Sequence, residues 1–274
     1  MCLPAHVGEL LVRCMMAPRK HTSYLFLASV LICFALGAVA LLLRPSASTA
    51  RVYSGRSMRE WLDDRVVTPE GPHILTPEAT AVVREIGDES IPTLLSWVKR
   101  SDYSLVEALH YRYGIPVALN QDWRTRGFYG FRALGEKMDV AIPELIELAM
   151  YDPNDGVRSA AINSLTEGRP LTTELLTIAL TDVEPDRRSR AANVLGYLRP
   201  PSAIEPLTHA LADPDYQVRL QSLRALRYYT DPLLPESTLQ AIELCSSASE
   251  SELREVAQAA LNYQKDYAKM NGDK

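Results

Sequence analysis

Aromatic residues are scarce in this sequence: Phe, Tyr and Trp make up 7% of its 274 residues. Aromatic and β-branched side chains favour strands, whereas the Leu and Ala that are frequent in the second half favour helices. Gly and Pro number only 13 and 18, and neither forms a periodic run, which excludes a collagen-like or low-complexity chain. Hydrophobic residues make up 47%, enough to bury a sizeable core, so we predict an all-α globular fold.

Cysteine and positive charge are also limited, and each shortage excludes a class of protein. Three of the four cysteines precede residue 50 and only Cys245 follows, so the soluble part cannot form a disulfide within itself. The formal net charge of -5 provides no overall positive field that would hold a polyanion. We therefore expect no nucleic acid among the partners.

The short motifs of common enzyme classes are missing as well. There is no Walker loop, no dinucleotide-binding glycine pattern, no G-x-S-x-G elbow and no H-E-x-x-H. The five histidines are far apart, and none has a second His or Cys at the spacing of metal ligands. We predict that the protein is not an enzyme and has no catalytic residues, no metal site and no cofactor.

One long hydrophobic run is present near the N-terminus. Residues 24–43 read YLFLASVLICFALGAVALLL without a charge, so as a helix they would cross the ~30 Å hydrocarbon core of a bilayer. A cleaved signal peptide is the alternative, because Ser48 and Ala50 offer small residues for cleavage. Signal peptides usually have only ~7–15 apolar residues, which favours an uncleaved transmembrane anchor.

This anchor divides the chain into a short tail (1–23), the anchor (24–43), a linker (44–56) and a globular part (57–274). Arg and Lys flank the run in similar numbers on both sides, so charge does not set the orientation. A short N-terminus inside and a long domain outside is common for a first span. We predict a single-pass protein of the inner (plasma) membrane whose globular part is periplasmic or extracellular.

The second half of the chain repeats itself. Three segments share a pattern in which an arginine is followed by a small residue and then by Leu. They begin with D-P-N-D-G-V-R-S-A-A, E-P-D-R-R-S-R-A-A and D-P-D-Y-Q-V-R-L-Q-S. The four copies contain Arg158, Ala161 and Leu165; Arg188, Ala191 and Leu195; Arg219, Ser222 and Leu226; and Arg254, Ala257 and Leu261. The small residue and the Leu share one helix face, which lets a neighbouring helix approach closely.

Each such helix follows a second apolar stretch, so the repeating unit is helix, acidic turn, helix. The arginines are 30, 31 and 35 residues apart, which fits an α-solenoid of stacked helix pairs. Weaker copies predict pairs at about 77–99 and 124–150, separated by an insertion at about 101–123. Ser57 followed by Glu60 indicates a helix start. We predict five to six helix pairs over about residues 57–270 and no sheet.

The repeat resembles the HEAT repeat. Pro143 and Pro206 occupy the position of the proline in the first helix, and Val157-Arg158 and Val218-Arg219 match the turn. Together with the anchor, the segment 53–62 resembles membrane-anchored HEAT-repeat proteins of bacteria. In HEAT proteins the turn Asp and the helix Arg link adjacent repeats. The resemblance therefore implies a structural ladder of Asp155, Arg158, Asp186, Arg188, Asp215, Arg219 and Arg254; alternatively, these arginines are solvated helix starts.

A candidate binding strip lies on the second helix of each pair. Positions two, five and nine after the repeat arginine share a face away from the Ala/Leu stripe, and HEAT solenoids usually turn this helix to their concave side. Tyr and Arg are enriched at interface hot spots. The strip consists of Arg190, Asn193, Tyr197, Arg224, Tyr228 and Tyr263. Alternatively, the tyrosines pack over the next repeat with their hydroxyls in water.

The insertion is a second candidate site, with His110, Tyr111, Tyr113, Asn120 and Trp123, unless these residues only pack within it.

We predict a non-enzymatic, membrane-tethered scaffold that binds a protein partner along the concave face of the solenoid. Some HEAT-like solenoids, namely alkyl-purine DNA glycosylases and phycobilin lyases, act on ligands. A lyase-like, ligand-processing enzyme is therefore the alternative function, and a secreted protein with a cleaved signal is the alternative to the anchored form.

Overall fold

The computed structural model describes residues 52–67, 73–100, 120–166, 170–229 and 233–272. The chain divides into two compact units, Met1–Val52 and Tyr53–Lys274, and the helices described below belong to the second. The predicted tail and anchor, and the linker up to residue 51, lie outside the described residues. Within the described ranges, no helix is both long enough and apolar enough to cross a bilayer.

Short strands precede the repeats, which corrects the prediction of no sheet. The two hairpins are β1 (Val52–Tyr53) with β2 (Arg56–Ser57) and β3 (Arg65–Val67) with β4 (His73–Leu75). The second hairpin is antiparallel and sets Val66 opposite Ile74. β-Branched side chains favour extended backbone, and these runs are too short to form a repeat helix. The strands therefore lie where the repeat pattern has not yet begun.

Helix α3 (Met58–Asp63) lies between the two hairpins and starts as the sequence predicts. The side chain of Ser57 accepts a hydrogen bond from the N–H of Glu60 at 3.3 Å, and the Glu60 carboxylate accepts one from the N–H of Ser57 at 2.7 Å. This reciprocal capping box satisfies two N–H groups at the helix start. The indole N–H of Trp61 donates to the carbonyl oxygen of Tyr53 at 2.9 Å, which ties α3 to the first hairpin.

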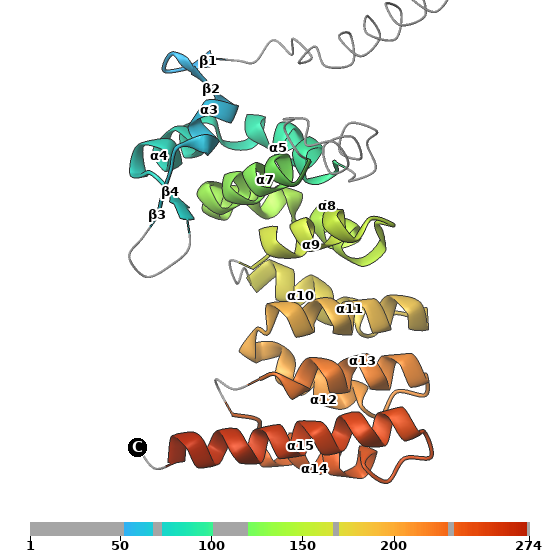
Figure 1. Cartoon of the computed structure of the whole chain (residues 1–274). Helices are drawn as coiled ribbons and strands as arrows, with labels where there is room; N and C mark the ends of the chain where they lie inside the picture. Colours follow the sequence, from blue (N-terminus) through green and yellow to red (C-terminus); the bar gives the residue numbers. More distant parts are fainter. Residues whose placement is uncertain (1–51, 68–72, 101–119, 167–169, 230–232, 273–274) are drawn as a thin grey trace, which may run out of the picture. The chain divides into compact units, whose positions relative to one another are not determined.

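After α4 (Pro77–Ile86), five helix pairs stack in the described part of the chain (Figure 1). The pairs are α5 (Ile91–Val98) with α7 (Asn120–Leu134), α8 (Ile142–Tyr151) with α9 (Asp155–Ser164), α10 (Pro170–Ala179) with α11 (Pro185–Leu198), α12 (Ile204–Ala210) with α13 (Tyr216–Arg227), and α14 (Glu236–Cys245) with α15 (Ser251–Gly272). Short 3₁₀ segments, η1 (Gly87–Ser90), η2 (Gly135–Ala141) and η3 (Pro201–Ala203), lead into α5, α8 and α12. The predicted solenoid of helix pairs is confirmed for this region.

The predicted insertion lies between α5 and α7, which form one pair, so it does not separate the two pairs predicted at about 77–99 and 124–150. Helix α7 begins at Asn120, so the last residues of the range 101–123 are helical rather than part of a loop. The rest of the insertion, with His110, Tyr111 and Tyr113, lies outside the described residues.

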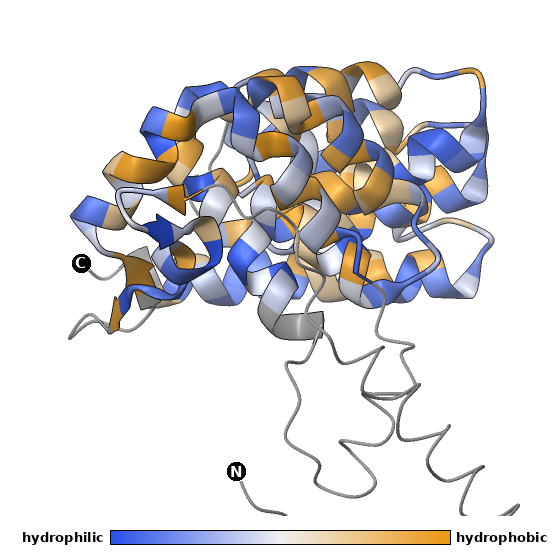
Figure 2. Cartoon of the chain, turned by 90° about the horizontal axis from the view of Figure 1, so that it is seen from above, coloured by the Kyte–Doolittle hydropathy of each residue, from blue (hydrophilic) through white to orange (hydrophobic). Residues whose placement is uncertain are grey.

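The second helices of successive pairs meet at the small residues of the repeat. Ala161, Ala191, Ser222 and Ala257 are each 0% exposed. Leu165, Leu195 and Leu226 are buried too, whereas Leu261 is only partly buried, because α15 belongs to the last described pair. Figure 2 shows hydrophobic and hydrophilic residues alternating along the helices, as expected for helices that bury one face. Buried residues from Met58 to Ala260 form one hydrophobic cluster.

Candidate partner-binding groove

The four repeat arginines make one hydrogen bond in common. In each, Nη1 donates to the main-chain carbonyl oxygen six residues earlier, in the turn that precedes the helix. The bonds are Arg158 to Asp152 (2.7 Å), Arg188 to Asp182 (2.8 Å), Arg219 to Asp213 (2.9 Å) and Arg254 to Ala248 (2.8 Å). Each arginine thus supplies a donor to a turn carbonyl that no helix satisfies.

Two of these arginines also bind the next repeat. The Arg188 guanidinium donates to both carboxylate oxygens of Asp213 at 2.8 Å, and Arg219 donates to Glu250 at 2.5 Å. The Arg188 and Asp213 side chains are 13% and 11% exposed. Burial raises the pKa of Asp213, but hydrogen bonds from Arg188 and from the N–H of Asp215 outweigh it and hold the pKa below its usual value. The arginines are therefore structural links between repeats.

The carboxylates of this ladder differ from those that the resemblance implies. The expected residues bind within their own helices: Asp155 pairs with Arg158, Asp186 pairs with Arg190, and Asp215 accepts hydrogen bonds from two N–H groups at the start of α13. Asp215 is occupied by the free N–H groups of the helix start, and Asp155 and Asp186 lie within the first turn, where an arginine three or four positions later is in reach. The bridging residue, Asp213, lies two positions earlier in the turn.

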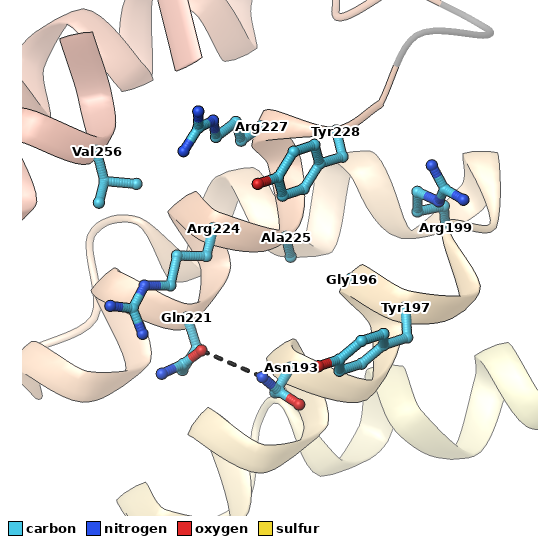
Figure 3. A pocket seen from close by; sticks show the side chains of 10 residues that line it. All are labelled: Asn193, Gly196, Tyr197, Arg199, Gln221, Arg224, Ala225, Arg227, Tyr228 and Val256. Carbon is cyan, nitrogen blue, oxygen red and sulfur yellow. Dashed lines mark hydrogen bonds between the residues drawn. The ribbon is translucent and has the colours of Figure 1, made fainter. Parts of the chain in front are cut away.

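A pocket of about 560 Å³ lies on the second helices, between α11 and α13 and next to α15 (Figure 3). Its lining residues are Asn193, Gly196, Tyr197, Arg199, Gln221, Arg224, Ala225, Arg227, Tyr228 and Val256. A Cβ atom at Gly196 would lie 2.9 Å from Cα of Ala225, so glycine at this position allows the close approach of α11 and α13.

Two tyrosines form the walls of this pocket. In Figure 3 the rings of Tyr197 and Tyr228 lie on opposite sides of Gly196 and Ala225, which form the floor. The tyrosines are 63% and 48% exposed, although each has a large apolar ring. Both hydroxyls point toward the end of the pocket where Asn193 lies (Figure 3). We call this pocket, with its ten lining residues, the tyrosine groove.

Polar groups occupy the two ends of the tyrosine groove. At one end Asn193 donates to the side-chain oxygen of Gln221 at 3.3 Å, and Arg224 pairs with Glu252 at 2.5 Å. At the other end lies Arg199, in the left-handed region with φ 49, where it ends α11. Among the described residues, neither Arg199 nor Arg227 has a carboxylate partner. The groove is therefore more basic than the chain as a whole.

The structure brings together four of the six residues of the predicted binding strip. Asn193, Tyr197, Arg224 and Tyr228 line the groove. Tyr263 contacts the ring of Tyr228 edge-on, with 6.1 Å between the ring centres, and so extends the aromatic wall.

Arg190, the remaining strip residue, is placed elsewhere. It pairs with Asp186, donates to the carbonyl oxygen of Met150 at 2.7 Å and lies 5.0 Å from the ring centre of Tyr151. These contacts join α11 to α8, so Arg190 does not line the groove.

The predicted strip lacks three polar lining residues, Gln221, Arg199 and Arg227, besides the apolar Gly196, Ala225 and Val256. Gln221 lies two positions after Arg219, and this position is already part of the strip rule, so the signal was present. Arg199 and Arg227 lie at helix ends, outside the periodic positions.

No group of acidic, His or Cys residues in the described ranges could hold a metal ion.

Comparisons with known proteins concern the repeats. A family model described as HEAT repeats matches residues 172–262. This range begins in α10 and ends in α15, and it contains the whole tyrosine groove. No curated protein matches the chain.

Solved structures resemble the chain only distantly. One is human deoxyhypusine hydroxylase in complex with glycerol, at 16% identity and a TM-score of 0.36, covering 69% of this chain and 78% of that one. Another is a designed armadillo repeat protein in complex with the peptide (KR)4, at 16% identity and a TM-score of 0.33, covering 76% and 98%. Similarities this low indicate nothing about activity.

Proposed function

We propose that the chain is a non-enzymatic scaffold that binds a protein partner in the tyrosine groove. The observation that carries the proposal is the pair of exposed rings, Tyr197 and Tyr228, on either side of a floor made of Gly196 and Ala225. Tyr offers a large apolar area, a hydroxyl that can hydrogen-bond and few rotatable bonds, which is why it is frequent at binding hot spots. The low floor leaves room for an extended segment between the rings.

The charges at the groove favour a partner segment that carries carboxylates. Arg199 and Arg227 have no carboxylate partner among the described residues, whereas the carboxylate of Glu252 is already bound to Arg224. A partner could bind in the tyrosine groove without breaking an ion pair of the repeat ladder, because Arg188 and Arg219 bind carboxylates that do not line the groove. Scaffold function and ladder stability are therefore separable by mutation.

The test is a pull-down from solubilised membranes with the full chain as bait. A specific partner should be retained by the wild type and lost with the double variant Tyr197→Ala and Tyr228→Ala. Tyr151→Ala is the matched control, because Tyr151 is 37% exposed but lies outside the groove. Retention that ignores the double variant, or that is lost equally with Tyr151→Ala, contradicts the proposed groove. A small molecule that co-purifies and is chemically changed would instead favour a ligand-processing enzyme.

We also propose that residues 24–43 anchor the scaffold in the inner (plasma) membrane, with the repeats periplasmic or extracellular. The support is the uncharged run of this segment. Alkaline washing of membranes should leave the protein in the pellet, and an externally added protease should digest the repeats in intact spheroplasts. N-terminal sequencing of the mature protein separates the anchor from the signal peptide: a start near residue 50 would show that the segment is cleaved.

A further inference from the structure

A second polar cluster surrounds the indole ring of Trp123, at the start of α7. The guanidinium carbons of Arg100, Arg59 and Arg126 lie 4.3, 4.9 and 4.9 Å from the ring centre. A guanidinium group stacks favourably on an aromatic face. Three such groups around one ring, however, place like charges close together, and this arrangement needs negative charge nearby.

The described residues supply one carboxylate to this cluster. Asp63 accepts two hydrogen bonds from Arg126, at 2.6 and 3.1 Å, and lies within 3.9 Å of Arg59 and 3.8 Å of Arg65. Arg100 has no carboxylate partner in the part of the chain that the structure describes. Three guanidinium groups, those of Arg126, Arg59 and Arg65, therefore share one carboxylate among the described residues, in a protein whose net charge is -5.

Two observations indicate an excess of positive charge among the described residues of this cluster. Arg126 is only 7% exposed, and its Nη1 atom is buried without a hydrogen-bond partner. Burial, and then the charges of Arg126 and Arg59, lower the pKa of Arg100. A buried charged donor without an acceptor costs free energy, so the cluster is costly to maintain in the absence of an anion.

The exposed members of the cluster are held in place for binding. Arg124 donates to the main-chain carbonyl oxygen of Arg100 at 2.8 Å, which fixes Arg100 beside α7. Arg59 belongs to α3, and the buried Arg126 adds its positive charge to the cluster. Trp97 packs against Trp123 with 5.4 Å between the ring centres and supports the ring from behind the cluster.

We propose that Arg59 and Arg100, beside Trp123, form a binding site for a phosphoryl group, free or in the headgroup of an anionic phospholipid. Guanidinium groups match phosphate oxygens with paired N–H donors. A phosphoryl group offers more oxygens than a carboxylate and carries up to two negative charges, so it can bind Arg59 and Arg100 together while Asp63 keeps its two hydrogen bonds from Arg126. This site is independent of the tyrosine groove.

The test uses the full chain in a neutral maltoside detergent and measures binding of inorganic phosphate by calorimetry, with chloride keeping the ionic strength constant. The wild type should bind saturably. Arg59→Gln and Arg100→Gln should each weaken binding by about tenfold or more, the effect of losing a charge-assisted hydrogen bond. Lys269→Gln is the matched control, because it removes one positive charge from an exposed position of α15 outside both proposed sites and should leave the affinity unchanged.

A second arm distinguishes the two sources of the phosphoryl group. Maltoside micelles containing phosphatidic acid are compared with micelles containing the same amount of oleate, whose charge is a carboxylate. Binding of free phosphate identifies a soluble ligand, and binding of phosphatidic acid alone identifies a headgroup; both support the site. The proposal is overturned if neither arm is saturable, if oleate binds as well as phosphatidic acid, or if Lys269→Gln weakens binding as much as Arg100→Gln. Unchanged helical circular dichroism shows that each variant is folded.

Discussion

Arginine serves two different purposes at the two ends of the described repeats. Between α11 and α15, the repeat arginines are satisfied by turn carbonyls, and Arg188 and Arg219 also bind carboxylates of the next repeat. Around Trp123, Arg59 and Arg126 share the carboxylate of Asp63 with Arg65, Arg100 has no carboxylate partner among the described residues, and one buried donor is unsatisfied. An arginine stabilises a fold where acceptors are built into the backbone, and it becomes a candidate ligand-binding group where they are missing.

The largest expected effect concerns the hydrophobic packing beneath the ladder. Leu195 is 0% exposed, so Leu195→Ala should leave a cavity and cost ~2–5 kcal/mol in the free energy of unfolding. Leu261→Ala is the matched control, since Leu261 has the same place in the repeat but is only partly buried. Urea denaturation of both variants measures the difference. Equal losses would mean that burial in the central repeats is not what stabilises the array.

The next effect tests the ladder itself. Asp213→Asn removes the charge that binds Arg188 and should cost ~1–3 kcal/mol, because both side chains are largely buried and the guanidinium group would lose its partner. Asp155→Asn should cost less than ~0.5 kcal/mol, because the Asp155 side chain is 86% exposed and its ion pair is screened by water. The same denaturation experiment applies. A larger loss for Asp155→Asn would place the ladder where the resemblance first implied it.

Acid should remove the contribution of Asp213 in the wild type. The pKa of Asp213 is held below the ordinary aspartate value of 3.8. Its ion pair therefore stabilises the fold fully above about pH 4, and this stabilisation is lost as the pH falls through the folded-state pKa. The difference in unfolding free energy between wild type and Asp213→Asn should be constant near pH 7 and should shrink below about pH 4. A difference that persists in acid would show that the pair contributes through packing rather than charge.

The smallest expected change in the free energy of unfolding concerns the Trp123 cluster, and its sign is opposite to those above. Arg100→Gln removes a charge that burial and neighbouring arginines disfavour. Without a bound anion, the variant should be as stable as the wild type or more stable by up to ~0.5 kcal/mol, since exposed charges interact weakly. Arg188→Gln should instead destabilise the protein, because it breaks the bond to Asp213. Thermal melts in phosphate-free buffer compare the two. A clear loss with Arg100→Gln would mean that this arginine is structural.

The sequence predicted what depends on periodic spacing. The repeat arginine with its small residue and Leu located α9, α11, α13 and α15, and the small positions are the buried contacts between second helices. The same spacing placed four residues in the tyrosine groove. Positions at helix ends, such as Arg199, follow no period and were missed.

Contacts between distant residues could not be predicted in this way. Asp63 and Arg126 are 63 positions apart and belong to α3 and α7, which differ from the regular repeats. The role of Asp213 could not be predicted because its turn also contains Asp215. The pattern does not tell which of the two aspartates caps the helix and which one binds the arginine of the previous repeat. The short hairpins carry too few residues for a reliable alternation of side chains.

The hydrogen bond from each repeat arginine to a turn carbonyl also bears on how the chain tolerates change. A main-chain carbonyl is present whatever the side chain, and the four acceptors belong to three aspartates and one alanine. In three turns the aspartate carboxylate also accepts the N–H two residues later, whereas the turn with Ala248 keeps the arginine bond without this second one. The bond to the main chain is therefore the feature that turns of different composition share, and it lets their side chains diverge without its loss.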